Sequence, residues 1–165
     1  MKKVMMIILL VFFLTGCFQG LSIQEVPLPV EKGVVEEVQV LEVIDGDTVK
    51  LSDGRRVRYI GIDTPETVDP HRTDECYGLE ASLRNKELVE GKMVQLEMDK
   101  EDKDDFGRSL RYVWMDDILV NEVLVKEGYA RAKKYPPNVK YHSMLLSAQK
   151  EAKVQDLGLW GTCQE

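Results

Sequence analysis

Apolar and polar residues alternate with a period of two along residues 34–62. Three pairs of apolar residues keep this spacing: Val38 with Val40, Val49 with Leu51, and Val57 with Tyr59. Such alternation is typical of strands that bury one face, because successive side chains point to opposite sides of a sheet. Asp53-Gly54 separates the last two pairs and indicates a tight hairpin between two strands.

The alternation also assigns two charged residues to faces of the predicted strands. Asp47 shares the parity of Val49 and Leu51, so we expect its carboxylate to point inward near the mouth of the enclosed space. Arg58 lies on the face opposite to that of its two strand neighbours. Because twist and closure of a sheet can bring such a side chain to a shared cleft, parity alone leaves the position of Arg58 open.

The second half of the chain mixes strands with helices. A helix is predicted at residues 78–90, with Gly91 suited to ending it, and strands are predicted at residues 94–98 and 110–115. A short helix follows, in which Val120, Val123 and Leu124 share a face, and Gly128 provides its stop.

The last helix has the clearest pattern. Its apolar residues follow the spacing of three and four that is typical of an amphipathic helix: Tyr141, Met144, Leu145, Ala148 and Ala152. Asn138 is the expected N-cap. Together these elements predict an α+β domain in which five strands form a small closed sheet, with helices inserted late and no internal repeats.

The first sixteen residues have the pattern of an export signal. Two lysines follow Met1, and residues 4–14 form an apolar run of eleven. That run is too short for a transmembrane helix, which needs about 20 residues. The ending Leu-Thr-Gly-Cys17 resembles the lipobox of bacterial lipoproteins, which implies a lipid on Cys17 and anchoring at the outer face of the cell membrane. The alternative is an ordinary cleaved signal peptide and a freely secreted protein.

The chain is therefore divided into three parts. Residues 1–16 are the predicted signal peptide, and residues 17–33 lack periodicity and contain two prolines, which favours an extended tether. Residues 34–165 are long enough for one domain with a real core. Nothing in the sequence indicates more than a monomer.

The cysteines of the predicted domain form an even pair. Cys76 and Cys163 remain once Cys17 is assigned to lipid. In an exported chain such a pair favours a disulfide, which would join the C-terminal tail to the loop after Glu66. The alternative is two unpaired thiols.

Three motifs carry charged residues that suit phosphodiester chemistry. Asp45-Gly-Asp47 comes first, residues 58–66 read Arg-Tyr-Ile-Gly-Ile-Asp-Thr-Pro-Glu, and Asp105-Phe-Gly-Arg108 follows. A hard divalent cation prefers oxygen ligands, a phosphate under attack is stabilised by guanidinium groups, and an attacking water needs a carboxylate base. The sequence therefore predicts a metal-dependent phosphodiesterase that acts on nucleic acid.

The net charge argues against bulk electrostatic binding of nucleic acid. It is −7, and removal of residues 1–16, which carry two lysines and no other charged residue, makes it −9. Cationic residues nevertheless cluster at two places, Arg55, Arg56 and Arg58 and then Arg131, Lys133, Lys134 and Lys140. We therefore expect weak, salt-sensitive binding of a short stretch of strand.

The motifs, in this order, resemble the signature segments of the thermonuclease family, the staphylococcal-nuclease-like proteins. Residues 120–125 and Leu159-Trp160 are similar to that family too, so the resemblance covers residues 38–161. It implies an OB-fold five-stranded β-barrel with three helices, dependence on Ca²⁺, and endonucleolytic and exonucleolytic cleavage of DNA and RNA that leaves 3′-phosphates. Single strands or flexible ends are the favoured substrates.

The resemblance implies ligands for the calcium ion. Asp47 and Asp63 would bind through carboxylates and Thr64 through its backbone carbonyl, with substrate phosphate and water completing the shell. Taken alone, Asp47 is more simply interpreted as a turn residue, since Asp-Gly-Asp often serves turns.

The resemblance also implies catalytic roles for three residues. Glu66 would be the general base that acts on the attacking water. Arg58 and Arg108 would stabilise charge on the phosphate in the transition state. Taken alone, Glu66 reads as a solvated loop residue, and a buried arginine can belong to a structural ion pair.

The chain departs from the family at the substrate end of the site. Asp105 and Phe106 stand where relatives often have lysine and tyrosine, which implies weaker binding but keeps a stacking face. Tyr135 is the candidate for stacking on a base or touching a terminal phosphate.

The other polar segments are expected to have no catalytic role. Residues 97–105 carry six carboxylates without the spacing of an EF-hand, so we expect a solvated loop. His71 and His142 lack a zinc-ligand pattern.

Two other classes of function stay open: an OB-fold module that binds nucleic acid without cleaving it, and a membrane-associated adaptor that binds protein through its acidic face.

Overall fold

A computed structural model describes residues 33, 35–67 and 75–163. The predicted signal peptide, Cys17 and the tether up to residue 32 lie outside the described residues, so their predicted roles stay predictions. Within residues 33, 35–67 and 75–163, none of the helices has the length and apolar character needed to cross a bilayer.

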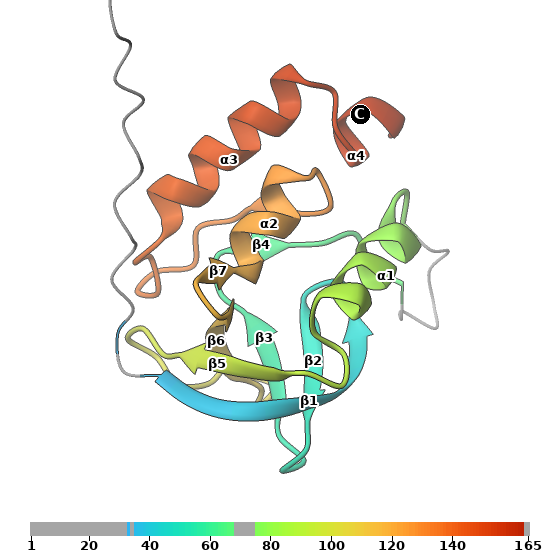
Figure 1. Ribbon diagram of the computed structural model, residues 1–165. Helices are drawn as coiled ribbons and strands as arrows, with labels where there is room; N and C mark the ends of the chain where they lie inside the picture. Colours follow the sequence, from blue (N-terminus) through green and yellow to red (C-terminus); the bar gives the residue numbers. More distant parts are fainter. Residues whose placement is uncertain (1–32, 34, 68–74, 164–165) are drawn as a thin grey trace, which may run out of the picture.

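Five strands close into a barrel (Figure 1). They are β1 (Val35–Asp45), β2 (Thr48–Leu51), β3 (Arg56–Tyr59), β5 (Met93–Glu97) and β6 (Ser109–Met115). The long strand β1 pairs antiparallel with β5 through its first half and with β2 through its second half. Parallel pairing of β3 with β6 closes the barrel. The predicted α+β class and five-stranded OB-fold barrel are confirmed.

The barrel interior is filled by the apolar residues that alternate along the sequence. Val40, Val49, Leu51 and Val57 are fully buried, and Tyr59 is nearly so. The predicted hairpin lies between β2 and β3, where Gly54 has a positive φ of 89°. The period of two therefore identified the buried face correctly, because each strand presents one face to the same core.

Two short ladders complete the strands. β7 (Ile118–Leu119) pairs with the end of β6, and β4 (Ile62–Asp63) pairs with β8 (Arg131–Ala132). The β4–β8 ladder was not predicted, since a two-residue strand has no measurable periodicity. It matters because it places the segment after Ala132 beside Asp63.

Three helices lie where they were expected, and one further turn follows. They are α1 (Gly78–Val89), α2 (Val120–Lys126) and α3 (His142–Val154), with α4 (Leu159–Thr162) at the end. In Figure 1, α2 lies between α3 and the barrel, and α1 packs beside β1. Gly91 and Gly128 follow α1 and α2 with positive φ of 75° and 80°, as expected of residues that end helices.

Two expectations about polar residues were wrong. Asn138 does not cap α3, which begins at His142; its side-chain oxygen accepts hydrogen bonds of 2.8 Å from the backbone N–H groups of Lys100 and Glu101. Glu97 is not part of a solvated loop but belongs to β5 and is 1% exposed. In both cases partners distant in the sequence satisfy a buried polar group, which a local pattern cannot reveal.

Candidate active site

The turn between β1 and β2 places two carboxylates at the mouth of the barrel. Asp45 accepts a 2.8 Å hydrogen bond from the N–H of Gly46, and Asp47, which is fully buried, accepts one of 2.9 Å from the N–H of Thr64. A Cβ at Gly46 would lie 2.7 Å from the Thr64 hydroxyl, so glycine permits this close approach. The turn is therefore held against the segment that follows β4.

Arg58 connects the two aspartates that were expected to bind metal. Its guanidinium donates one hydrogen bond to Asp47 and another, of 2.7 Å, to Asp63. The register of β2 and β3 sets Thr48 opposite Arg58, so the preceding Asp47 lies within reach of the guanidinium. The side chain of Arg58 is 12% exposed and lies at the mouth of the barrel, a position that parity alone had left open.

The surroundings of Asp47 disfavour its charged form. Burial raises its pKa, and the charges of Asp45 and Asp63 add to the rise, whereas the charge of Arg58 and the Thr64 hydrogen bond oppose it. The pKa of Asp47 is therefore above its ordinary value. The cluster holds more negative charge than its neighbouring guanidinium neutralises.

Glu66 is part of the same cluster. Burial raises its pKa to about 7, and hydrogen bonding and charge interaction with Asp45 act in the same direction. Asp45 is itself fixed by a 2.9 Å hydrogen bond from the Thr67 hydroxyl. The carboxyl groups of Glu66 and Asp45 are thus close enough to interact directly.

A cleft of about 770 Å³ opens between the barrel and the loops around it. Its walls include all three residues that were expected to be catalytic, Arg58, Glu66 and Arg108, together with Phe106 and Tyr135. A smaller hollow of about 130 Å³ beside it shares Arg58, Glu66 and Arg108 with the cleft. The structure therefore brings together residues from β3, from the segment after β4 and from the loop before β6.

Arg108 is oriented by an acidic neighbour. Its Nε atom donates a 2.6 Å hydrogen bond to Asp104, which also accepts a 2.9 Å bond from the Arg108 backbone N–H. The guanidinium lies 5.3 Å from the centre of the Phe106 ring, and Phe106 is 85% exposed at the edge of the cleft. Asp105 is exposed beside it.

Tyr135 and Lys133 line the side of the site that the β4–β8 ladder builds. Lys133 donates a 2.9 Å hydrogen bond to Asp63, and its Nζ atom lies 5.3 Å from the centre of the Tyr135 ring. The Tyr135 hydroxyl lies 3.5 Å from the same aspartate. Tyr135 is 37% exposed, so its ring is available to a ligand in the cleft.

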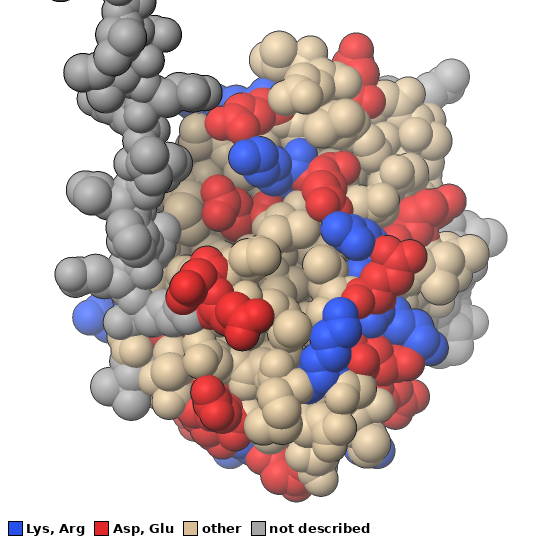
Figure 2. Space-filling view, viewed as in Figure 1, with Lys and Arg blue, Asp and Glu red and all other residues tan. Residues whose placement is uncertain are grey.

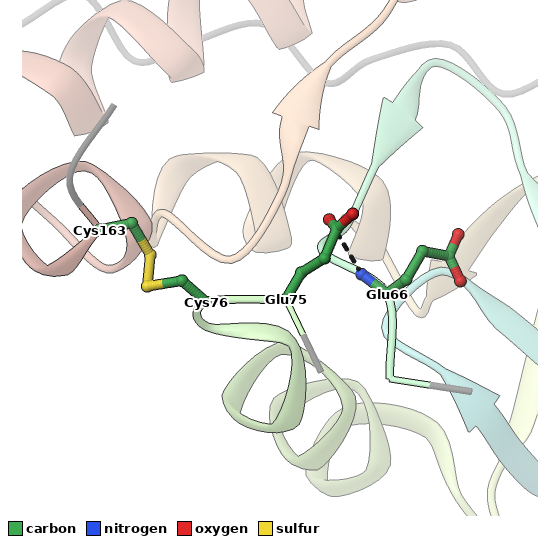
Figure 3. The surroundings of a disulfide bond; sticks show 4 residues. All are labelled: Glu66, Glu75, Cys76 and Cys163. Atoms are coloured by element: carbon green, nitrogen blue, oxygen red, sulfur yellow. Dashed lines mark hydrogen bonds between the residues drawn. A yellow bond between two sulfur atoms is a disulfide. The ribbon is translucent and has the colours of Figure 1, made fainter. Parts of the chain in front are cut away.

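Cys76 and Cys163 form a disulfide, with Cα atoms 5.9 Å apart (Figure 3). The bond joins the residue two before α1 to the residue that ends α4. It links positions separated by 87 residues.

The residues at the mouth fit a calcium ion. Among residues 33, 35–67 and 75–163, no three His, Cys, Asp or Glu side chains form a metal-binding group by themselves. Calcium, however, accepts backbone carbonyls, water and phosphate oxygens beside carboxylates. Asp47 and Asp63 offer carboxylates around a single guanidinium, and the Thr64 hydroxyl is buried with no hydrogen-bond partner in the described part of the chain. These groups are oxygen ligands of the kind that a hard cation prefers.

Four residues of the site had no role assigned from the sequence. Asp45 interacts with Glu66, and Asp104 accepts a hydrogen bond from Arg108. Arg56 lines both the cleft and the smaller hollow. Lys133 donates a hydrogen bond to Asp63. Asp45 belongs to the Asp-Gly-Asp motif, and Arg56 and Lys133 belong to the two cationic clusters, so a signal existed for these three. Asp104 gave no such signal, because it lies within the acidic segment of residues 97–105 that was interpreted as a solvated loop.

The charge on the surface is mixed. On the face shown in Figure 2, acidic and basic side chains are interspersed with uncharged surface, and no broad basic face is seen. This agrees with a net charge of −7 and with attraction of substrate that is local to the cleft.

Comparison with known proteins identifies the family. Residues 56–162 match the family described as Staphylococcal nuclease homologue. A thermonuclease of Staphylococcus intermedius is 49% identical over 128 residues, which are 76% of this chain and 76% of that protein. A thermonuclease of Staphylococcus hyicus is 46% identical over 125 residues, 74% of each chain.

A relative from another genus gives the same result. The endonuclease YncB of Bacillus subtilis (strain 168) is 48% identical over 122 residues, which are 71% of this chain and 58% of that protein. With its closed barrel and its charged cleft, the chain belongs to the staphylococcal nuclease family.

Proposed function

We propose that this nuclease is calcium-dependent and hydrolyses phosphodiester bonds of DNA and RNA to leave 3′-phosphate ends. The observation that carries the proposal is the convergence of Arg58, Glu66 and Arg108 on one cleft, with Arg58 bonded to Asp47 and Asp63. The family and the thermonuclease relatives support the activity.

Calcium would be held by Asp47, Asp63 and the backbone carbonyl of Thr64, and when bound it would offset the negative charge of the scissile phosphate. The other roles belong to the chain itself. Glu66 accepts a proton from the attacking water, whose oxygen forms a new bond to phosphorus. The bond from phosphorus to the 5′ oxygen breaks, and that oxygen takes up a proton from solvent and leaves as a hydroxyl group, so the phosphate stays on the 3′ side.

Arg58 and Arg108 stabilise the charge that builds on the phosphate oxygens. A guanidinium has five N–H donors, so Arg58 can contact a phosphate as well as its two aspartates. Arg108 is held by Asp104 through its Nε atom, which leaves the other donors of its planar fork for a phosphate. Phe106 and Tyr135 offer exposed ring faces for bases, which favours single strands or flexible ends.

The activity is tested by digesting DNA and RNA oligonucleotides, single- and double-stranded, with calcium and again with a calcium chelator. We expect cleavage only with calcium, and products that carry a 3′-phosphate, seen as a mobility shift after phosphatase treatment. Binding of the oligonucleotide without cleavage under any condition would instead favour a non-catalytic binding module.

The role of Arg108 is tested against a matched arginine. Loss of one such donor typically lowers the rate by about 10² to 10³-fold, so we expect this loss in Arg108→Lys. Arg111 forms a similar 2.6 Å ion pair with Asp102 but does not line the cleft, so Arg111→Lys should keep kcat. Equal kcat values for the two folded variants would remove Arg108 from the mechanism.

We also propose that the protein is exported and held at the outer face of the membrane by a lipid on Cys17, or is secreted. The disulfide supports an oxidising compartment, since such bonds persist mainly outside the cytosol. Incorporation of labelled fatty acid into the wild type but not into Cys17→Ser tests the anchor.

We further propose that the nuclease is a monomer, and sedimentation of the mature protein tests this.

A further inference from the structure

The backbone of Glu66 is held by the segment that leads into α1. The Glu75 N–H donates a 3.0 Å hydrogen bond to the Glu66 carbonyl, and the Glu75 carboxylate lies 3.4 Å from the Glu66 N–H (Figure 3). The Glu66 side chain points away from this contact in Figure 3. Glu66 and Glu75 are therefore joined directly behind the carboxylate that faces the cleft.

Gly78 brings the first turn of α1 against the same backbone. A Cβ at Gly78 would lie 2.9 Å from the Glu66 carbonyl oxygen and 3.1 Å from that of Pro65. The Gly78 N–H also donates a 2.9 Å hydrogen bond to the Glu75 carbonyl. The third neighbour of such a Cβ is the Thr67 side-chain methyl, at 2.9 Å. Because the other two are backbone oxygens, which cannot turn aside as a side chain can, an added methyl group has to displace the segment that carries Glu66.

The disulfide ties this support to the C-terminal part of the protein. Cys76 lies between Glu75 and Gly78 and is bonded to Cys163 at the end of α4. α4 is itself fixed, since Leu159 is 2% exposed and its N–H donates a 2.9 Å bond to the Gly128 carbonyl. A covalent link therefore connects a packed helix to the segment behind Glu66.

We propose that the Cys76–Cys163 disulfide, acting through the Glu75–Gly78 segment, positions Glu66 for catalysis. This rests on the proposed role of Glu66 as general base. Cys76, Cys163 and Gly78 are positioning residues, because none of them faces the cleft or touches substrate. The link sets the distance of the Glu66 carboxylate from the attacking water, and it has little effect on the binding of the nucleic acid.

The first test removes the bond and separates kcat from KM. The Cys76→Ser/Cys163→Ser double variant is compared with the wild type on a single-stranded DNA oligonucleotide with calcium, well below both unfolding transitions. We expect kcat to fall about 10-fold with KM within about twofold, since a small displacement of a reacting group costs this much or more. Dithiothreitol should lower kcat of the wild type reversibly and leave the double variant unchanged.

The second test asks whether the effect passes through Glu66. In a Glu66→Gln background, removing the disulfide should leave the residual rate unchanged, because the group that it positions has gone. A further 10-fold fall in that background would show that the bond acts by another route and would overturn the proposal. A wild-type kcat in the double variant would overturn it as well.

Gly78→Ala disturbs the same contact without touching the disulfide. We expect a fall in kcat similar to that of the double variant, again with little change in KM. The matched control is Leu79→Ala, the next residue of α1, whose side chain is 57% exposed and which should keep kcat. If the double variant does not fold, the comparison of Gly78→Ala with Leu79→Ala and the dithiothreitol titration still test the proposal. An unchanged kcat in Gly78→Ala and in the reduced wild type would contradict it.

The outcomes also distinguish this inference from the proposed function. If Glu66→Gln is fully active, the role of Glu66 fails and the inference fails with it. If Glu66→Gln is inactive while the double variant and Gly78→Ala are fully active, the function stands and only the positioning role is lost.

Discussion

Asp47 and Glu97 are two buried carboxylates on the same barrel, but their surroundings differ. Glu97, 1% exposed, accepts hydrogen bonds from Trp114, Tyr141, Lys140 and the Gly33 N–H. Burial alone would raise its pKa, but these hydrogen bonds outweigh the effect and hold the pKa of Glu97 below its ordinary value. Asp47 is as deeply buried, and its pKa is raised.

The difference lies in the neighbours. The donors around Glu97 come from Gly33, which precedes β1, from β6 and from the start of α3, so this carboxylate holds three parts of the chain together. Asp47 shares one guanidinium with Asp63 and lies near Asp45. A carboxylate saturated by donors stabilises the fold, whereas a group of carboxylates short of positive charge is suited to a cation and a substrate.

Neutralising one carboxylate of each kind should separate catalysis from stability. In Glu66→Gln, from the crowded cluster, we expect kcat to fall by about 10² to 10⁴-fold, the usual contribution of a general base. The free energy of unfolding should change little. Single-turnover cleavage of a DNA oligonucleotide measures the rate, and Glu80→Gln, exposed on α1, is the control.

Glu97→Gln should show the opposite result. Hydrogen bonds to a buried charged group are worth about 1.5 to 3 kcal/mol, so we expect the free energy of unfolding to fall by about 2 to 3 kcal/mol. The rate of the folded variant should stay close to that of the wild type. Urea unfolding measures the loss, with the exposed Glu42→Gln as control. A large fall in kcat with intact stability would place Glu97 in the catalytic cluster.

Calcium should stabilise the protein through the carboxylates around Arg58 and not through Glu97. A ligand at 100 times its Kd adds about 2.7 kcal/mol to the free energy of unfolding, which sets the scale of the effect. We expect this increment in the wild type and in Glu97→Gln but not in Asp63→Asn, which lacks a proposed ligand. Thermal unfolding with calcium and with chelator measures it independently of activity. An equal increment in Asp63→Asn would exclude that residue as a ligand.

The smallest expected effect is the pH dependence of the Glu97 contribution. Because the pKa of Glu97 is lower in the folded than in the unfolded protein, its stabilisation is fully present above the ordinary value of 4.5 and is lost as the pH falls through the folded pKa. Each unit of depression is worth about 1.4 kcal/mol. The difference in unfolding free energy between wild type and Glu97→Gln should therefore shrink below pH 4.5. A difference that grows in acid would contradict the assignment.

Much of the fold could be predicted from the sequence because it depends on local patterns. The alternation at Val49, Leu51 and Val57 identified the barrel face, and Gly91 and Gly128 marked the ends of α1 and α2. The β4–β8 ladder could not be predicted in this way, because pairings of two residues have no period. Asn138 was misassigned for a related reason, since its partners lie 37 and 38 residues away.

The site was predicted as a set of residue types rather than as an arrangement. The motifs named Arg58, Glu66 and Arg108, and the resemblance assigned their roles. Neither indicated that Asp104 holds Arg108 or that Asp45 interacts with Glu66. Neither indicated that the disulfide is joined through Glu75 to the backbone of Glu66.

Local patterns and motifs in the sequence were enough to predict the barrel, the helix ends, the family and the chemical groups available at the site. Only the tertiary structure decided which carboxylates are saturated. Glu97 meets Lys140 and Tyr141 from 43 and 44 residues away. Hydrophobic periodicity is a property of neighbouring residues, whereas the pKa and the role of a carboxylate depend on every donor and charge that folding brings to it.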